Sequence, residues 1–326
     1  MSEGQTMRRS TPAVRTHGVS KRFGRQVALT DLRLSVDAGT VCGFLGPNGA
    51  GKTTAIKLLA GLYRPTAGVV EVLGHDVAHA RDTVQGLIGY LPGDFTGYAD
   101  QSGRRFLRLV ADLRGGVDWA FVAELAERLE LDLDRRIGTL SRGNRQKVGI
   151  VQALMNQAPL LLLDEPTSGL DPLMQREFHR LLREARDRGQ TVLLSSHVLS
   201  EVAAVADDVA ILREGRLLDF RSMADLRTGL SRRIDMTFDA TVPTTRILQV
   251  PGVRDLQVVG GTAQVDIAGP AAALLRAVVD HGLRDVQTHE TDLADVFLGY
   301  YTKGATHADD LSQGSVGPTP DAACVG

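Results

Sequence analysis

The stretch that decides the fold of this chain is Gly46-Pro47-Asn48-Gly49-Ala50-Gly51-Lys52-Thr53-Thr54. Its first eight residues match G-x-x-x-x-G-K-[ST], between an apolar run at 41–45 and helical spacing at 53–62. Glycines allow backbone N–H groups to converge on phosphate oxygens, and the start of a helix adds further donors. We therefore predict a strand, a phosphate-binding loop and a helix. Lys52 is expected to reach the β- and γ-phosphates of a nucleotide, and Thr53 to bind Mg²⁺.

A second pattern places two acids at the end of an apolar run. Residues 160–163 are all leucine, which indicates a strand buried on both faces of a parallel sheet, and Asp164 and Glu165 follow directly. Ligands of such sheets bind at the carboxyl edge. Asp164 is therefore expected to hold Mg²⁺ through water, and Glu165 to activate an attacking water as general base. A solvated strand end is the alternative, and the phosphate-binding loop earlier in the chain weakens it.

Further stretches narrow the choice among nucleotide-hydrolysing proteins. Leu140-Ser141-Arg142-Gly143-Asn144 opens a predicted helix, Pro166-Thr167-Ser168-Gly169-Leu170-Asp171-Pro172 follows the acids, and His197 ends the next predicted strand. Together with Lys21-Arg22-Phe23-Gly24, they make residues 14–220 resemble the ATP-binding subunits of ABC transporters. The resemblance is to the bacterial exporter type with a C-terminal extension, a P-loop NTPase with an α/β core.

The resemblance implies a role for each matched residue. Lys52, Glu165 and His197 are expected to be catalytic, with His197 sensing the γ-phosphate. Ser141 and Gly143 are expected to contact ATP held by a second copy, and Asp171 to link the two sites across the dimer. Phe23 is expected to stack on adenine, although a buried core phenylalanine remains the alternative. The implied cofactors are ATP and Mg²⁺, and the implied partners are a second ATP-binding subunit and a separately encoded transmembrane permease.

Three positions depart from the family pattern. Arg142 and Asn144 replace a glycine and a glutamine, and the Arg142 charge either helps a phosphate site or points to solvent. Gly93 stands where the family usually has a glutamine that coordinates Mg²⁺. We hypothesise that the adjacent Asp94 substitutes for it, directly or through water. Mg²⁺-dependent ATP hydrolysis that is unchanged in Asp94→Ala would contradict this hypothesis.

Composition limits the cellular setting. The 326 residues carry a net charge of −2, which offers no global field for nucleic acid, so no nucleic-acid partner is predicted. Cys42 and Cys324 are too few and too far apart for a disulfide framework. No run of 18 apolar residues occurs, and the first residues lack the apolar core of a secretory signal. We predict a cytoplasmic protein that is peripheral on the inner face of the membrane through its permease.

The hydrophobic pattern predicts several domains. Residues 1–12 and 302–326 are expected to be disordered, and 13–225 to form the ATP-binding domain. That domain would contain short antiparallel strands within 13–34 and a helical subdomain at about 95–155. Residues 226–301 are expected to form a small α+β domain with the order β, short α, β, β, α, β, which resembles a ferredoxin-like fold. A final helix is predicted at 293–301, and 292–297 resembles a segment near the end of exporter subunits.

The leading functional prediction is an ATP-driven dimer whose closing and opening powers a membrane permease, with transported cargo chosen by the permease. Two alternatives stay open. One is a soluble ABC-type ATPase of translation or DNA repair, although those proteins typically carry tandem cassettes and this chain has one set of motifs. The other is a resistance protein whose ATPase activity regulates rather than pumps.

Overall fold

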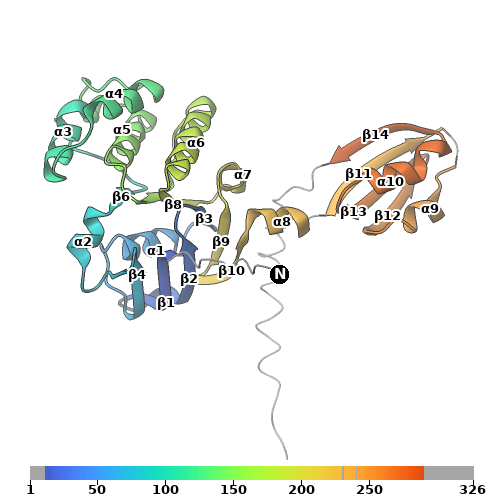
Figure 1. Ribbon diagram of the computed structural model, residues 1–326, viewed down its shortest axis with the longest axis horizontal. Coiled ribbons are helices and arrows are strands. Elements are labelled where there is room, and N and C mark those ends of the chain that lie inside the picture. Colours follow the sequence, from blue (N-terminus) through green and yellow to red (C-terminus); the bar gives the residue numbers. More distant parts are fainter. Residues whose placement is uncertain (1–11, 230, 240, 290–326) are drawn as a thin grey trace, which may run out of the picture. The chain divides into compact units, whose positions relative to one another are not determined.

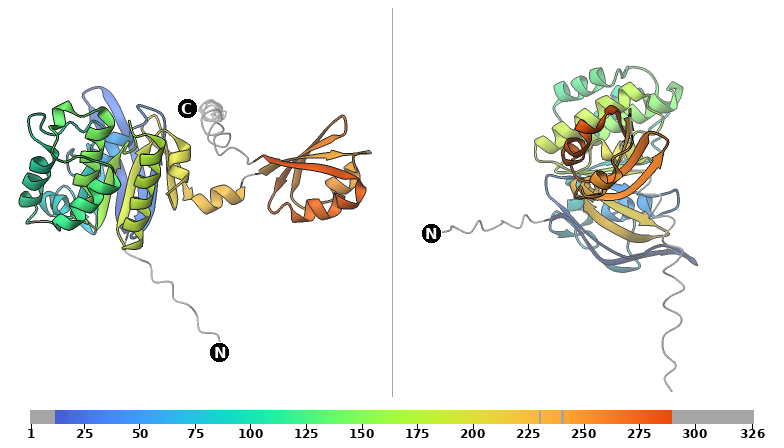
Figure 2. Two further views of the ribbon diagram at one scale, coloured as in Figure 1. Left: turned by 90° about the horizontal axis from the view of Figure 1, so that it is seen from above. Right: turned by 90° about the vertical axis from the view of Figure 1, so that its right-hand side faces the viewer.

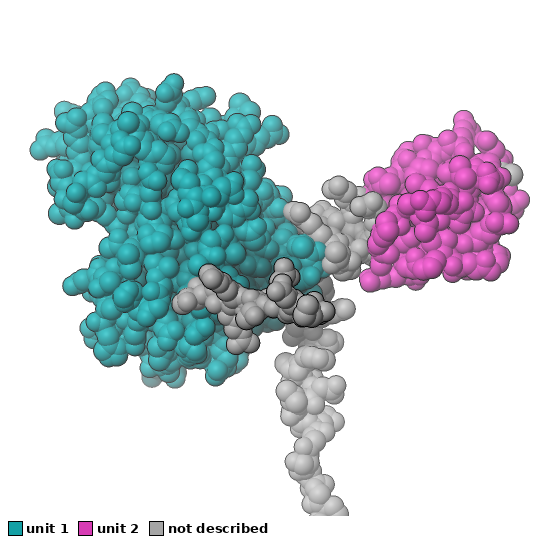
Figure 3. All heavy atoms as spheres, in the orientation of Figure 1, with its two compact units in different colours: residues 1–226 teal, residues 227–326 magenta. Residues whose placement is uncertain are grey.

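The structure, a computed structural model, describes residues 12–229, 231–239 and 241–289. It divides into two compact units whose boundary lies between Leu226 and Arg227 (Figure 3). Residues 1–11 and 290–326 lie outside the described residues. They include most of the two predicted disordered ends, the predicted helix at 293–301 and the segment 292–297.

A six-stranded sheet with the order β10-β9-β3-β8-β7-β6 forms the centre of the first unit (Figure 1). Neighbouring strands are parallel, except that β10 runs antiparallel to β9. Every residue of β3, β7 and β8 is buried, which explains why apolar residues predominate in these strands. The strands are β3 Val41–Leu45, β6 Ile88–Leu91, β7 Leu160–Asp164, β8 Thr191–Ser196, β9 Asp208–Arg213 and β10 Arg216–Ser222.

A second, antiparallel sheet has the order β2-β1-β4-β5. Its strands are β1 Pro12–Phe23, β2 Gln26–Asp37, β4 Ala67–Val72 and β5 His75–Asp76. The sequence predicted short strands within 13–34, but β1 and β2 have 12 residues each. That prediction came from the alternation of apolar and polar residues around Gly18 and Gly24. In the structure Gly18 has a φ of 62° at a register shift between Thr16 and Val19, so it bends one long strand without ending it.

Helices cover both faces of the central sheet. On one face α1 (Lys52–Leu59) packs in a core shared with the antiparallel sheet, and on the other α3 to α6 form a second core. Figures 1 and 2 show the helices α3, α4 and α5 gathered at one end of the unit. No helix in the described part of the chain is long and apolar enough to cross a membrane. The other helices of this unit are α2 Arg81–Gly86, α3 Gly103–Leu113, α4 Trp119–Arg128, η1 Ile137–Thr139, α5 Arg142–Leu154, α6 Pro172–Asp187 and α7 Leu199–Ala203. Helix α8 (Met223–Gly229) contains the boundary between the two units.

One arginine joins two of these helices. Arg128 at the end of α4 donates to Glu177 Oε1 at 2.7 Å and to both oxygens of Glu184 at 2.7 Å, and both acids belong to α6. Bidentate pairs of this kind are stronger and more directional than single contacts. The hydrogen bonds from Arg128 also hold the pKa of the Glu184 carboxyl below its usual value. Arg128 therefore links α4 to α6, the helix that follows β7.

Replacing Arg128 with methionine is expected to lower the free energy of unfolding by about 2 kcal/mol near pH 7. Because the folded-state pKa of Glu184 is depressed, this contribution is present above its unfolded pKa of about 4.5 and is lost as pH falls through the folded value. Urea unfolding at pH 7 and pH 4 measures both effects. Arg180→Met is the control, since Arg180 is 63% exposed and contacts only one of the two acids, Glu177. Equal losses in the two variants would contradict the prediction.

The second unit is an antiparallel sheet with helices on one face. Its elements follow the order β11 Ser231–Phe238, α9 Thr244–Leu248, β12 Val253–Val259, β13 Thr262–Ala268, α10 Ala272–Val278, η2 Val279–His281 and β14 Leu283–His289. The strand order is β12-β13-β11-β14. Figure 2 shows the two helices beside one face of the sheet. Ile247 of α9 and Leu274 of α10 share a buried core with Ile234 and Val265 of the central strands.

Candidate nucleotide-binding site

Three of the predicted motifs meet at one edge of the central sheet. Strands β3, β8 and β7 are adjacent and parallel, so their carboxyl ends lie side by side. Gly46 follows β3, Glu165 follows β7 and His197 follows β8. Residues that are far apart in sequence are thus placed together by strand order, at the edge where ligands of parallel sheets bind.

The loop 46–51 surrounds the amino group of Lys52. This side chain is only 6% exposed, and its Nζ donates to the carbonyl oxygens of Gly46 at 2.6 Å and Pro47 at 3.2 Å. Gly51, at the start of α1, has a φ of 104°, and a Cβ there would lie 2.8 Å from the carbonyl oxygen of Ala28. Only glycine satisfies both constraints, which explains the residue directly before the lysine.

Asp164 is the buried carboxylate of the site, with 2% exposure. Its Oδ1 accepts hydrogen bonds from Ser195 Oγ at 2.6 Å and from Thr53 Oγ1 at 3.1 Å. A carboxylate and a hydroxyl beside a phosphate-binding loop are the oxygen donors that Mg²⁺ uses when nucleotide phosphates and water complete its shell. No group of three or more His, Cys, Asp or Glu residues in the described chain forms a metal cage. The Thr53 hydroxyl and the Asp164 carboxylate fit a magnesium ion whose other ligands are nucleotide phosphates and water.

The carboxylate of Glu165 lies between two basic side chains. Its Oε1 is 3.4 Å from Lys52 Nζ, and its Oε2 is 2.9 Å from His197 Nδ1. Because a carboxylate only accepts, this contact requires a proton on Nδ1 of His197. The backbone φ of Glu165 is 44°, an unfavourable value for a non-glycine residue, and its N–H donates to Ser195 Oγ at 2.9 Å. The backbone thus turns sharply after β7 and is held in that turn by β8.

The segment 141–144 begins helix α5. Ser141 Oγ accepts from the N–H of Asn144 at 3.2 Å and caps the helix. A Cβ on Gly143 would lie 2.4 Å from the carbonyl oxygen of Gly169, so the close approach of these two segments requires glycine. Arg142 is exposed, and its Nη2 donates to Ser168 Oγ at 2.8 Å.

Asp171 caps helix α6. Its Oδ1 accepts from the backbone N–H groups of Met174 and Leu173, each at 3.0 Å, and Pro172 occupies the first turn. These hydrogen bonds hold the pKa of the Asp171 carboxyl below its usual value, and the one from Met174 has the largest effect. Sequence reasoning did not predict this capping role, although an Asp-Pro pair before a helical pattern signals it.

Phe23 is not a core residue. Its side chain is 42% exposed, and its ring meets the edge of Tyr63 with the centroids 5.2 Å apart. The ammonium group of Lys21 lies 4.9 Å from the Phe23 ring. The alternative of a buried phenylalanine is therefore wrong, and Phe23, at the end of β1, is an exposed ring that contacts the partly buried Tyr63.

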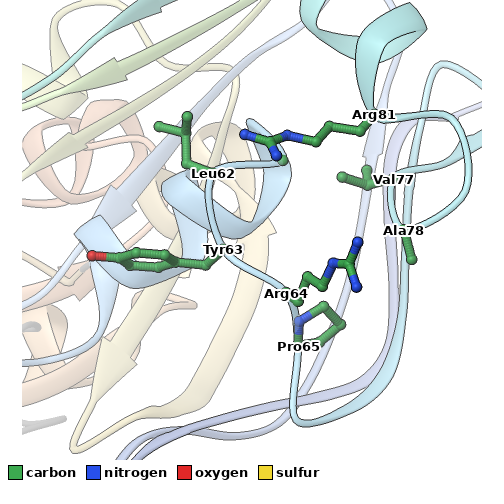
Figure 4. Close-up of a pocket in the computed structure, with 8 residues that line it drawn as sticks. Leu62, Tyr63, Arg64, Pro65, Val77, Ala78 and Arg81 are labelled. Atoms are coloured by element: carbon green, nitrogen blue, oxygen red, sulfur yellow. The ribbon is translucent and has the colours of Figure 1, made fainter.

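A pocket of about 250 Å³, with Tyr63 in its lining, contains none of the predicted site residues (Figure 4). Figure 4 shows Arg64 and Arg81 between the two chain segments that form its walls. The pocket is lined by Gly61, Leu62, Tyr63, Arg64, Pro65, Val77, Ala78 and Arg81. Since it lacks the lysine, the acids and the histidine of the sheet edge, we locate the candidate chemistry at that edge and not in the pocket.

Gly93 lies beside the buried carboxylate. A Cβ at this position would be 3.2 Å from Asp164 Oδ2, so the loop that lacks the usual glutamine still comes within contact distance of Asp164. The neighbouring Asp94 is exposed. Tyr90 precedes this loop and has a buried hydroxyl without a hydrogen-bond partner. Burial raises the pKa of that hydroxyl, and the charges of Asp164 and Asp94 add to the effect.

Sequence reasoning missed several polar residues around the site. Ser195 touches both acids, since it donates to Asp164 and accepts from the Glu165 N–H. Gln146 of α5 donates to the carbonyl oxygens of Glu165 and Pro166. The sequence offered one signal, the pair Ser195-Ser196 directly before His197. It offered none for Gln146, whose partners are backbone atoms of a distant segment.

A sequence profile described as ABC transporter matches residues 29–168. The chain is 36% identical over 209 residues to a bacitracin transport ATP-binding protein of Bacillus licheniformis, covering 63% of this chain and 68% of that one. It is 36% identical over 232 residues to the daunorubicin/doxorubicin resistance ATP-binding protein of Streptomyces peucetius, covering 69% of each chain.

Two solved structures resemble the first unit. One is described as an ATP-binding subunit of an ABC transporter, with a TM-score of 0.62, 30% identity, and coverage of 66% of this chain and 92% of that one. The other is described as a dimeric bacterial ABC transporter cassette, with a TM-score of 0.60, 22% identity, and coverage of 64% and 98%. The second likeness concerns the fold alone.

Proposed function

This chain belongs to the ABC transporter family of ATP-binding proteins, and from that premise we propose that it hydrolyses ATP in sites shared between two copies. It is the ATP-binding subunit, an ATPase, of an exporter-type transporter. The observation that best supports the proposed chemistry is the contact of the Glu165 carboxylate with both Lys52 and His197. The Glu165 carboxylate, which can accept a proton, thus lies beside the Lys52 ammonium, which can bind phosphate, and beside the imidazole of His197.

The proposed roles follow from these positions. Lys52, now bonded to two carbonyl oxygens of its own loop, would transfer those hydrogen bonds to phosphate oxygens of ATP. Glu165 would accept a proton from the attacking water, and His197 would hold the carboxylate in place through Nδ1. The remaining ATP contacts are assigned to Phe23 on adenine and to the backbone and side chains of 46–51, Thr53 and Thr54.

Mg²⁺ would be held by Thr53 and Asp164, and it would neutralise charge on the β- and γ-phosphates. Both residues already point at one another, with the hydroxyl 3.1 Å from the carboxylate. Gly93 supplies no side chain to this group, and Asp94 is retained as the hypothetical substitute for the usual glutamine. Ser141 and Gly143 are assigned to the ATP of the second copy, and Asp171 to the loop that links the two sites across the dimer.

The partners and location are also proposals. Two copies would close on two ATP molecules, and hydrolysis would release them, which drives a separately encoded transmembrane permease. The chain would then lie in the cytoplasm on the inner face of the membrane. Because the named relatives concern bacitracin and daunorubicin, we propose a drug or antibiotic as cargo. Co-purification with the permease, followed by a search for compounds that stimulate ATP hydrolysis, tests both statements.

We also propose domain limits of 13–225 for the ATP-binding domain and 226–301 for a ferredoxin-like domain. The element order β11-α9-β12-β13-α10-β14 and the strand order β12-β13-β11-β14 support the latter assignment. In this arrangement β13 separates β11 from β12, as in the split βαβ units of that fold.

Mixed dimers test whether the sites are shared. One chain carries Lys52→Met and the other Ser141→Asp, both with Glu165→Gln so that ATP is retained. Aspartate still caps α5 but adds negative charge where the partner's phosphate is proposed to bind. Neither variant alone should dimerise with ATP. The mixture should form dimers with one ATP per two chains, because one complete site remains.

Light scattering after size exclusion, with a count of bound nucleotide, measures this outcome. The control is the Glu165→Gln chain without other changes, which should dimerise with two ATP molecules. If the mixture behaves like the two separate variants, each site lies within one chain and the proposal is wrong.

A further inference from the structure

One carboxylate oxygen joins the two segments that carry Glu165 and His197. Glu201 of α7 accepts a hydrogen bond from Thr167 Oγ1 at 2.8 Å and another from Ser196 Oγ at 2.7 Å, both at Oε2. The two donors are almost fully buried, Thr167 with 5% and Ser196 with 1% exposure. This contact is separate from the phosphate-binding loop and from the Mg²⁺ position.

Both donors lie close in sequence to the two site residues. Thr167 comes two residues after Glu165, and Ser196 comes directly before His197. Ser196 Oγ also accepts from the N–H of Val198 at 2.9 Å, so it spans the backbone on both sides of His197. Glu201 therefore holds the turn that presents the histidine and the turn that presents the glutamate.

The physical consequence is a fixed distance between the two site residues. Hydroxyl to carboxylate bonds are charge-assisted and short, and they restrict position more than neutral bonds do. Removing the carboxylate leaves two buried hydroxyls without this partner, which costs free energy unless the segments shift. The contact of Glu165 Oε2 with His197 Nδ1 at 2.9 Å depends on both segments staying in place.

We propose that Glu201 is a positioning residue for the Glu165–His197 pair. The inference rests on the proposed function, because it gives Glu201 no contact with ATP and only an indirect effect on hydrolysis. The carboxylate acts by accepting from Thr167 and Ser196, and its charge is not otherwise required.

Three variants of the full chain separate this role from a structural one. Glu201→Ala should lower kcat for ATP hydrolysis about 10- to 100-fold, with the KM for ATP changed less than about threefold, since misplacement affects the reacting geometry and not the binding loop. Glu201→Gln should restore kcat to within about threefold of wild type, because its amide oxygen can accept both hydroxyls. Ser200→Ala, on the exposed side of the same helix, should leave both constants unchanged.

A double-mutant cycle gives an independent measurement. Thr167→Val should lower kcat by part of the Glu201→Ala effect, and the double variant should lose no more than Glu201→Ala alone. Thermal unfolding of each variant shows whether it is folded. If Glu201→Ala does not fold, Thr167→Val and Ser196→Ala carry the test, because the carboxylate remains and only the hydrogen bonds are removed.

Wild-type kcat in Glu201→Ala, or additive losses in the cycle, would overturn the inference. Equal losses of kcat in Glu201→Gln and Glu201→Ala would also overturn it, because the charge and not the two hydrogen bonds would then matter. Failure of the proposed function is distinguishable: Glu165→Gln would then keep its hydrolysis rate, whereas failure of the inference leaves that variant inactive.

Discussion

Replacing Glu165 with glutamine should lower kcat for ATP hydrolysis by about three orders of magnitude while ATP binding is retained. The amide oxygen of glutamine can accept a hydrogen bond from the Nδ1–H of His197, so this hydrogen bond can replace the 2.9 Å contact of the carboxylate. It cannot take a proton from water, and this is the step that the variant removes. Steady-state hydrolysis and nucleotide binding, measured on the same preparation, separate the two effects.

The matched control for this variant is Glu184→Gln. Glu184 is also hydrogen-bonded to a cationic side chain, Arg128, but it lies on α6 and not at the sheet edge. Its loss should reduce stability and leave kcat within about twofold. Hydrolysis by Glu165→Gln at the wild-type rate would exclude Glu165 as the base, and loss of ATP binding would show that its role is in binding.

Replacing Lys52 with methionine should weaken ATP binding about 100-fold, which corresponds to about 2.7 kcal/mol. Methionine fills much of the space of the lysine stem but has no charge for phosphate. In the present structure the Lys52 ammonium is satisfied by Gly46 and Pro47 carbonyls and lies 3.4 Å from Glu165, so it is held where a phosphate would arrive. Isothermal titration with ATP measures the change.

Arg180→Met serves as the control for loss of a cation, because Arg180 is exposed on α6. Its affinity for ATP should equal that of the wild type. Unchanged affinity in Lys52→Met would contradict the assignment of the loop 46–54 to phosphate. A loss of affinity that is accompanied by unfolding would be resolved by Lys52→Arg, which keeps the charge but not the shape of the ammonium group.

Local sequence patterns predicted most of the secondary structure of the first unit. The apolar runs at 41–45 and 160–163 lie in strands β3 and β7, because strands buried on both faces favour apolar residues on both faces. The glycine pattern before Lys52 likewise follows from local backbone constraints. The length of β1 was not predictable in the same way, since Gly18 reads as a turn until β2 and β4 pair with the strand around it.

The exposure of Phe23 depends on the tertiary structure, whereas the capping role of Asp171 depends on the local sequence. An aromatic residue in an alternating segment can face either side of a sheet, and only the tertiary structure shows that Phe23 is exposed, with its ring against Tyr63. The cap formed by Asp171 is local, and the Asp-Pro pair was enough to predict it, although we did not do so. The contact of Arg142 with Ser168 depends on the approach of α5 to the segment after β7, which no local pattern encodes.

The phosphate-binding loop, the acid-tipped strand and the family of this protein were determined by the sequence alone, because each depends on residue types at short spacing. The tertiary structure alone decided that Lys52, Glu165 and His197 touch, and that Glu201 joins the segments of the last two. The physical reason is the order of the parallel strands. Hydrogen bonding between β3, β8 and β7 brings their carboxyl ends to one edge, and side chains from distant positions then meet there.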